Sequence, residues 1–210
     1  KFQPLSAGDI DQIHEAVLEL LESLGLSQAP RCMIDLVTAN GGTLTANGRL
    51  LFPRDLVSSA LGGIRRDVTL WSRRNGYHLD ISGPRVHVGT GGAAPRILDI
   101  NTYWYRETTI RDLYDMACIV DQQEHIHFFS RPVVGTDAPN PLQLDINTLY
   151  ACLAGTSKHI CISVTLPENV RTIAEICYAV AGSEDNFRRR PFLTIMATHV
   201  VLRMRFATES

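Results

Sequence analysis

The feature that most constrains this chain is a regular alternation of apolar, strand-like runs with helical runs after Pro84. Parallel strands need a crossover connection between them, and strands buried on both faces read as nearly continuous apolar runs. The alternation therefore predicts a parallel sheet covered by helices on both faces. We predict strands at residues 86–88, 97–100, 126–134, 159–164 and 192–197, and helices at residues 109–121, 142–153 and 167–181.

The first 83 residues do not follow this rhythm. Ser6 and Asp9 form a helix N-terminus, and apolar residues then recur at helical spacing until Gly25. Asn47-Gly48 supplies the positive φ angles of a tight turn, which predicts a hairpin within residues 43–52. Helices at 30–39 and 53–61 and strands at 68–71 and 78–81 complete the prediction. We therefore expect an N-terminal α+β region, residues 1–83, and a β/α region, residues 84–210.

The length of the β/α region limits what it can form. A (β/α)8 TIM barrel takes roughly 250 residues, so residues 84–210 supply about half of one. Half a barrel leaves apolar sheet edges open, which is an aggregation hazard. Two interpretations stay open: an open doubly wound sheet, or the first half of a TIM barrel in a fragment of a longer protein. We favour the fragment, and we expect a homo-oligomer if the chain ends at Ser210.

Composition excludes several classes of protein. A net charge of −2 offers no electrostatic footprint for nucleic acid or an anionic membrane. The basic run at residues 188–190 follows two acidic residues, which predicts a solvated loop. No apolar run approaches the roughly 20 residues of a membrane span, and no secretory signal opens the sequence. Five scattered cysteines with apolar neighbours favour reduced core thiols in a cytoplasmic protein.

Short motifs in a fixed order connect the chain to a known family. They are Gly91-Gly-Ala-Ala-Pro95, Tyr105-Arg-Glu-Thr-Thr109, Asp112-Leu-Tyr114, Ile126-His-Phe-Phe129, Arg131-Pro132, Gly155-Thr-Ser-Lys-His159 and Arg190-Pro-Phe192. From about Leu5 to the last residue, the sequence resembles the trimethylamine:corrinoid methyltransferase family. The resemblance implies a TIM barrel and a chain longer than this one. It implies methyl transfer from a methylated or quaternary amine to the cobalt of a corrinoid (cobalamin) carried by a partner protein, with no metal bound directly by this chain.

The resemblance also bears on the substrate. The founding trimethylamine enzymes carry pyrrolysine in the later half of the barrel, beyond Ser210, so this sequence neither shows nor excludes it. Many relatives without pyrrolysine look like enzymes for glycine betaine or similar quaternary amines. We favour that group, because no pyrrolysine is visible in these residues.

An aromatic cluster, Tyr103-Trp-Tyr105, follows the first predicted barrel strand, with Arg106 beside it. Aromatic faces recognise a quaternary ammonium, and an arginine can bind a betaine carboxylate bidentately. We therefore predict Tyr103, Tyr105 and Arg106 as substrate-binding residues. In the structural alternative, two of the rings pack under the N-terminal region, and Arg106 pairs with Glu107 or Asp112.

Further site residues are expected on the loops that follow strands, where TIM barrels carry out their chemistry. Asp137 and His199 each follow a predicted strand, and we predict both as catalytic. For Asp137 the alternative is an Asx turn before Pro139. The turn at Gly91 and Gly92 lacks the spacing of a nucleotide fingerprint, and we predict it as an approach site for the corrinoid cofactor.

Two histidine motifs give different predictions. His125 and His127 alternate along a predicted strand, which suggests a metal pair, but no cysteine or carboxylate stands at ligand spacing. We therefore predict no metal site, and His127 as a substrate-binding residue that lines the barrel. Lys158 and His159 precede a strand, so we expect them on the opposite face, where they serve stability.

The leading hypothesis is a methyltransferase acting on trimethylamine, glycine betaine or a similar amine and a corrinoid protein. Two alternatives stay open. One is a non-catalytic amine- or betaine-binding half-barrel, and the other is a TIM-barrel enzyme of a different class in which Asp137 acts as a base.

Overall fold

A computed structural model describes residues 3–197, 200–201 and 204–206. Contacts divide the chain into two compact units, one from residues 1–65 and 198–208 and the other from residues 66–197. The predicted boundary between residues 83 and 84 lies inside the second unit, so the division into an N-terminal region and a barrel half stays a prediction. None of the described helices has the length and apolar character needed to cross a membrane.

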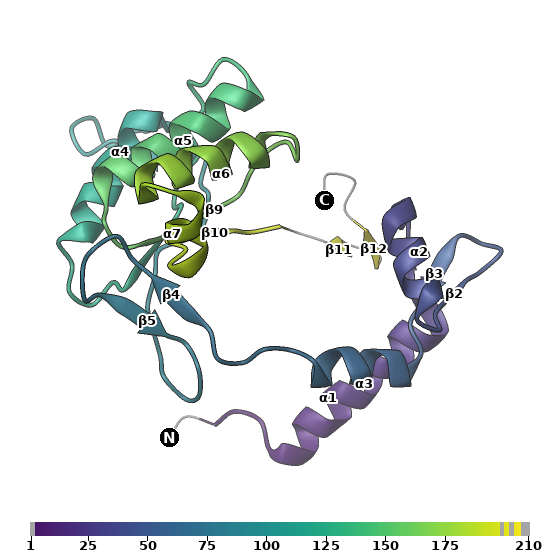
Figure 1. Ribbon diagram of the computed structural model, residues 1–210. Coiled ribbons are helices and arrows are strands. Elements are labelled where there is room, and N and C mark those ends of the chain that lie inside the picture. The colour runs from purple at the N-terminus through teal and green to yellow at the C-terminus, as the bar shows by residue number, and fades with distance from the viewer. Residues whose placement is uncertain (1–2, 198–199, 202–203, 207–210) are drawn as a thin grey trace. The chain divides into compact units, whose positions relative to one another are not determined.

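The first unit is built around a small mixed sheet (Figure 1). Its elements are α1 (Ala7–Glu19), η1 (Leu20–Leu24), β1 (Leu26–Ser27), α2 (Arg31–Ala39), β2 (Thr43–Leu44), β3 (Arg49–Leu51), α3 (Arg54–Gly62), β11 (Val200–Val201) and β12 (Arg205–Phe206). The strands pair in the order β11-β12-β1-β3-β2. Leu26, Val37, Leu50 and Phe206 form its buried core.

Local sequence signals in this unit agree with the structure. The Ser6 side chain accepts from the Asp9 backbone, and the Asp9 carboxylate accepts from the Ser6 backbone, which caps α1 at both orphan amides. The predicted hairpin is confirmed: β2 and β3 pair antiparallel, and Gly48 has a φ of 72° in the turn. Gly25 ends the first helical run at a φ of 62°, and a Cβ there would lie 2.2 Å from the Leu50 carbonyl oxygen. Only glycine fits that position.

The second unit carries the predicted parallel sheet. Its elements are β4 (Thr69–Trp71), β5 (His78–Asp80), β6 (Arg96–Leu98), β7 (Tyr105–Glu107), α4 (Ile110–Asp121), β8 (Phe128–Ser130), α5 (Pro141–Gly155), β9 (His159–Ile162), α6 (Asn169–Ala181), α7 (Glu184–Arg189) and β10 (Leu193–Ile195). β8, β9 and β10 pair parallel in chain order. Parallel bridges join Gly89 to Phe128 and Ala94 to Val133, which adds the segment 89–94 beside β8.

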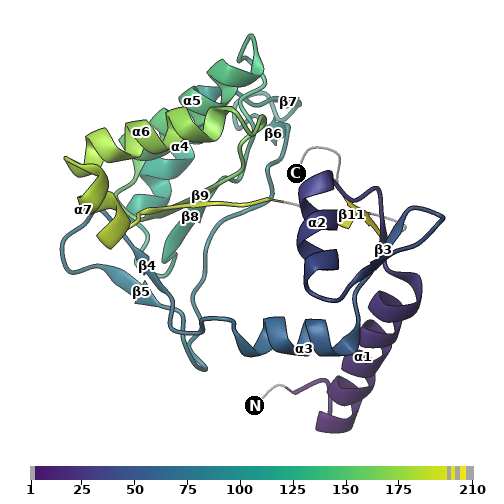
Figure 2. The ribbon, with the colours of Figure 1, turned by 45° about the vertical axis from the view of Figure 1, so that its right-hand side comes forward.

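All three long helices of this unit, α4, α5 and α6, lie on the same face of the sheet (Figure 2). The prediction that helices cover both faces is therefore wrong for the described residues. Strands in consecutive order with helices on one face are typical of barrel winding, whereas a doubly wound sheet reverses direction and carries helices on both sides. The described residues form a part of such a sheet and no closed barrel.

Alternation along the strands separates the two faces of the sheet. Phe129, Ile160 and Ile162 are fully buried in the core that the helices complete with side chains such as Leu113, Leu149 and Ile173. Burial of each such side chain stabilises the fold by about 1.5–3 kcal/mol. The intervening residues of β8, β9 and β10 face the opposite side, and they include Ser130, His159 and Thr194.

Several local predictions are wrong. Residues 86–88 form no named strand. The strand predicted at 97–100 is present as β6, but it pairs antiparallel with β7 instead of joining the parallel sheet. The basic run at 188–190 is not a loop: residues 184–189 form α7, which Ser183 caps, with acidic residues in its first turn and arginines in its last. That distribution of charge suits the helix dipole. Cys32 is exposed rather than buried, whereas Cys152, Cys161 and Cys177 are buried as predicted.

Candidate active site

The loops that follow the parallel strands meet at the carboxyl-terminal edge of the sheet. These loops begin after the segment 89–94, after β8 at Arg131, after β9 at Ser163 and after β10 at Met196. In parallel β/α folds this edge holds the ligand, because the loops can vary without disturbing the core. Three of the predicted site residues, Tyr103, Tyr105 and Arg106, belong to the first of these loops, and Gly91 and Gly92 lie in the segment 89–94 just before it.

The N-terminus of α4 is the best-organised polar group at this edge. Thr109 and Asp112 form a capping box, in which Asp112 Oδ2 accepts from the Thr109 backbone at 2.8 Å. Arg106 binds the same carboxylate with two nitrogens, at 2.8 and 2.7 Å, and reaches Asp99 at 3.1 Å. The Arg106 guanidinium, with the cap, holds the pKa of Asp112 far below its usual value. Arg106 therefore pairs with Asp112, as the structural alternative described. Its role in substrate binding stays a prediction.

Asp137 lies at the same helix terminus. Its Oδ1 accepts from the backbone N–H of Ile110, the first residue of α4, at 2.9 Å. The structure thus places Arg106 and Asp137 at the same helix terminus: Arg106 binds Asp112, which accepts from the backbone of the cap residue Thr109, and Asp137 accepts from the next amide, that of Ile110. Asp137 is exposed, and its second oxygen has no hydrogen-bond partner among the described residues. That oxygen can meet a cation.

The predicted aromatic residues project from the turn of the β6–β7 hairpin. Tyr103, Trp104 and Tyr105 are 77%, 78% and 73% exposed. The described residues of the second unit leave all three rings largely uncovered, and the packing of two rings under the N-terminal region, which the structural alternative described, stays a prediction. Tyr103 has a φ of 58°, which is left-handed backbone that tyrosine rarely adopts. The rings are therefore available to a ligand or partner.

The glycine turn is open. A Cβ at Gly91 would meet nothing closer than Ser130 Oγ at 3.9 Å, and one at Gly92 nothing closer than the Pro132 oxygen at 3.7 Å. Position 92 requires glycine because its φ is 126°, and not because a side chain would lack space there. Because no described side chain crowds the turn, its backbone can be approached by a large planar group. The cofactor role of Gly91 and Gly92 stays a prediction.

His125 and His127 do not join this group. His127 precedes β8, at the opposite, amino-terminal edge of the sheet, where its Nδ1 accepts from the Val88 backbone at 2.9 Å. His125 is exposed outside the strand. In the part of the chain that the structure describes, no group of three or more metal-ligating side chains could hold a metal ion. His199 lies outside the described residues, so its role stays a prediction.

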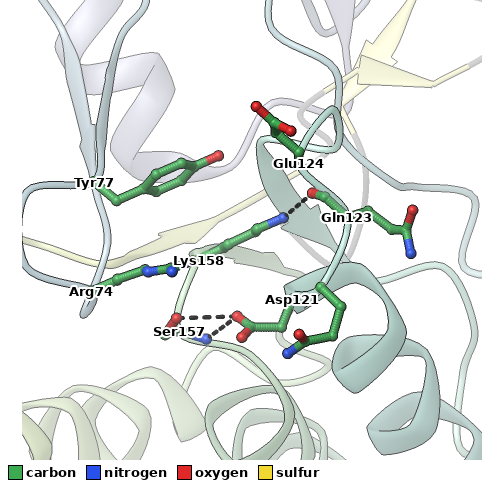
Figure 3. Close-up of a pocket in the computed structure, with 8 residues that line it drawn as sticks. Arg74, Tyr77, Asp121, Gln123, Glu124, Ser157 and Lys158 are labelled. Carbon is green, nitrogen blue, oxygen red and sulfur yellow. Dashed lines mark hydrogen bonds between the residues drawn. The ribbon is translucent and has the colours of Figure 1, made fainter.

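The amino-terminal edge is instead tied together by buried polar contacts. Lys158 is buried, and its Nζ donates to the carbonyl oxygens of Val120, Gln123 and Ile126 at 2.6–2.7 Å. Asp121 Oδ1 accepts from the Ser157 backbone at 2.7 Å (Figure 3). The polar cavity beside them, of about 460 Å³, is lined by Arg74, Tyr77, Asp121, Gln122, Gln123, Glu124, Ser157 and Lys158. Lys158 closes the end of α4, as expected of a residue that serves stability.

His159 has a similar structural position. It is buried, its Nδ1 donates to the Trp71 carbonyl at 2.7 Å, and its Nε2 lies 2.8 Å from the Thr194 hydroxyl. A carbonyl only accepts, so the Nδ1 carries the proton and Nε2 accepts from Thr194. Burial lowers the pKa of His159. A neutral histidine is therefore locked between β4 and β10.

Sequence reasoning missed the carboxylate that fixes the loop after β9. Asp145 is buried on α5 and accepts from the Thr165 backbone at 2.9 Å, from the Thr165 hydroxyl at 2.8 Å and from Asn169 Nδ2 at 2.6 Å. Asp145 is the one acidic residue in the predicted helix 142–153, and this was the available signal, because a buried carboxylate needs donors. Asp145 holds residues 163–168 at the candidate edge.

The sequence matches the family described as trimethylamine methyltransferase (MTTB) over residues 1–209. The chain belongs to this family. It is 27% identical over 183 residues to trimethylamine methyltransferase MttB of Desulfitobacterium hafniense, which covers 87% of this chain and 37% of that protein. It is 26% identical to the MttB of Methanosarcina barkeri, covering 90% of this chain and 39% of that protein. It is 22% identical to a glycine betaine methyltransferase of another Desulfitobacterium hafniense strain, covering 92% and 40%.

Membership confirms the family that the motifs suggested. The chain spans about two fifths of the length of the curated relatives it matches. The trimethylamine and glycine betaine enzymes match over similar ranges and at similar identity, so these comparisons do not separate the two substrates.

Proposed function

We propose that the protein to which this chain belongs moves a methyl group from a methylated or quaternary amine to the cobalt of a corrinoid protein. The observation that carries the proposal is the match to the trimethylamine methyltransferase family over residues 1–209. The parallel sheet supports it, because β8, β9 and β10 are wound as in the first half of a TIM barrel. We propose that residues 84–210 form that half and residues 1–83 the region before it.

The reaction asks the protein for position more than for acid or base chemistry. A corrinoid supplies a strongly nucleophilic cobalt, and the amine must present one methyl group in line with it. A quaternary ammonium has no proton to donate, so aromatic faces and carboxylates must recognise it. The carboxyl-terminal edge offers both kinds of group: the rings of Tyr103 and Tyr105, and the free oxygen of Asp137.

The remaining predicted residues complete the proposed site. Arg106 already pairs with the carboxylates of Asp99 and Asp112. To bind a betaine carboxylate, Arg106 must release one of these two partners. The open backbone at Gly91 and Gly92 fits a corrin that approaches the edge. His199 is proposed as a catalytic residue and His127 as a substrate contact. His127 lies before β8, at the amino-terminal edge of the sheet. Its proposed role therefore requires a substrate that reaches from the carboxyl-terminal edge towards the amino-terminal edge.

The substrate proposal is glycine betaine or a similar quaternary amine, with trimethylamine as the competing choice. The cobalamin belongs to a partner corrinoid protein, and we propose a homo-oligomer in the cytoplasm. The location is supported by the free thiols of the described residues.

Methylcobalamin formation tests the proposal. The full-length protein is mixed with cob(I)alamin and, in separate samples, glycine betaine, trimethylamine or dimethylamine, and the visible spectrum is followed. The proposal expects methylcobalamin with glycine betaine or trimethylamine. Calorimetric binding of an amine without methylcobalamin would favour a non-catalytic binding protein instead, and neither binding nor turnover would favour an enzyme of another class.

A further inference from the structure

The turn of the β6–β7 hairpin exposes unusually large apolar side chains. Ile100 is 79% exposed and Trp104 is 78% exposed, with Tyr103 between them at 77%. Single exposed apolar residues need no explanation, but a contiguous group of them marks an interaction site or a ligand groove. The turn joins strands that leave the carboxyl-terminal edge of the sheet, where the proposed site lies.

The turn is fixed before anything binds to it. Asp99 Oδ1 accepts from the backbone N–H groups of Asn101 and Thr102, each at 3.0 Å. The Asp99 backbone exchanges hydrogen bonds with the two aromatic residues, donating to Trp104 at 3.0 Å and accepting from Tyr103 at 2.9 Å. Asp99 Oδ2 binds Arg106. A rigid turn loses little conformational entropy when a partner docks.

Tyr103 adds a second indication. Its left-handed backbone, at a φ of 58°, is unfavourable for a residue with a Cβ, and glycine or asparagine normally takes such positions. Nothing in the fold of the hairpin requires a tyrosine ring there, because the ring is exposed. Strain held at an exposed aromatic residue indicates a function for that surface.

The chemistry of the surface selects the kind of partner. Arg106 of the hairpin is paired with Asp99 and with Asp112 of α4, so the exposed face of the turn, residues 99–104, presents aromatic and aliphatic side chains together with the uncharged Asn101 and Thr102. Three aromatic rings of about 150–250 Å² each, three quarters exposed, offer roughly 340–560 Å². A standard interface takes about 800 Å² per partner, so this area suits a smaller, transient contact.

We propose that the β6–β7 hairpin is the docking element for the corrinoid-carrying acceptor protein, through Ile100 and Trp104. The inference rests on the proposed function. Methyl transfer places the amine between the two proteins, so residues that hold the cation and residues that hold the acceptor must adjoin. The acceptor must also leave after each transfer. Tyrosine and tryptophan suit such a surface, because each carries a polar group that tolerates water between encounters.

Kinetics with two acceptors test the docking element. Trp104→Ala and Ile100→Ala are made in the full-length protein and assayed with free cob(I)alamin and with the purified corrinoid protein of the same organism, reduced to cobalt(I). We expect the KM for the corrinoid protein to rise at least about 10-fold, the usual effect of losing an aromatic anchor. Transfer to free cob(I)alamin stays unchanged. Tyr150→Ala, 69% exposed on α5, is the matched control and changes neither rate.

Several results would overturn the inference. An unchanged KM for the corrinoid protein does so, and equal losses with both acceptors place the hairpin in the fold or the chemistry instead. A large fall in the melting temperature of Trp104→Ala or Ile100→Ala shows that the remainder of the full-length chain already covers the turn, which leaves no surface for docking. If the unaltered protein transfers no methyl group to either acceptor, the proposed function fails separately. Docking is then judged by hydrogen exchange at residues 99–104, and no protection by the corrinoid protein ends the inference.

Discussion

Asp137 carries two roles that a pair of substitutions can separate. Its Oδ1 caps Ile110, whereas its free oxygen is the one proposed to face the amine. Asp137→Asn keeps an acceptor for the cap and removes the charge, so we expect an unchanged melting temperature and about a 10-fold loss of kcat/KM, the equivalent of about 1.4 kcal/mol. Asp137→Ala loses the cap as well, which costs about 0.5–2 kcal/mol of stability.

The matched control for Asp137 is Asp115→Asn. Asp115 is also a carboxylate of the α4 region, but it is paired with Arg111 at 2.9 Å. We expect it to change neither activity nor stability by a measurable amount, because exposed pairs contribute little. Full activity in Asp137→Asn together with a lower melting temperature in Asp137→Ala would leave Asp137 as a cap alone.

His159 predicts a pH dependence of stability. Burial lowers its pKa below the ordinary value of 6.5, so below that pH the unfolded chain binds a proton that the folded chain excludes. The free energy of unfolding should therefore fall as the pH drops through about 6.5, by at most about 1.4 kcal/mol per pH unit. Urea unfolding between about pH 7.5 and 5.5 measures this slope. His159→Gln, which keeps a donor and an acceptor, should flatten it, and an unchanged slope contradicts the assignment.

Single residues were predictable where one chemical rule decides. Lys158 and His159 were predicted to lie on the face opposite the candidate site, where they serve stability, because they precede a strand. The structure shows both side chains buried at the amino-terminal edge of the sheet. Arg106 was not decidable, because a bidentate site for a substrate and a bidentate pair with Asp112 need the same residue type. The left-handed Tyr103 could not be foreseen, since no sequence rule places a tyrosine there.

At the level of elements, Gly155 sets how closely α4 and α5 approach. A Cβ on Gly155 would lie 2.6 Å from Ala117 Cβ and 2.8 Å from the Tyr114 carbonyl oxygen. We expect Gly155→Ala to lower the free energy of unfolding by about 1–3 kcal/mol, because the helices must separate. Denaturant unfolding of the full-length protein measures the change.

The control for this prediction is Gly62→Ala. Gly62 ends α3 with open space around its Cβ position, so alanine should be neutral or stabilise by up to about 1 kcal/mol. If both variants behave alike, close packing at Gly155 is not what requires glycine.

Elements were predictable where a cap or a turn residue marked them. The capping box at Thr109 and the Asn140 cap of α5 give helices close to the predicted ranges. The β6–β7 hairpin was missed, because its turn, residues 99–104, has no glycine or proline and is held by the Asp99 side chain instead. The strands are shorter than predicted, because apolar runs continue past the last paired residue.

For the whole molecule, the winding of the sheet follows from its sequence but its closure does not. Consecutive parallel strands are a local consequence of the alternation after Pro84, whereas the position of the three long helices on one face of the sheet was not predicted. Closure needs further strands, and the matched relatives are more than twice as long as the range they share with this chain. The comparisons likewise do not separate the two substrates, because the trimethylamine and glycine betaine enzymes match this chain at similar identity.

Tracking the methyl carbon tests the central claim most directly. The full-length protein is incubated with cob(I)alamin and glycine betaine or trimethylamine labelled with carbon-13 in every N-methyl group, and the cobalamin is examined by mass spectrometry. We predict that the methyl group found on cobalt carries the label, and that the amine is released with one methyl group fewer. Cobalamin without labelled methyl from either donor, under conditions where the protein is folded, would contradict the account.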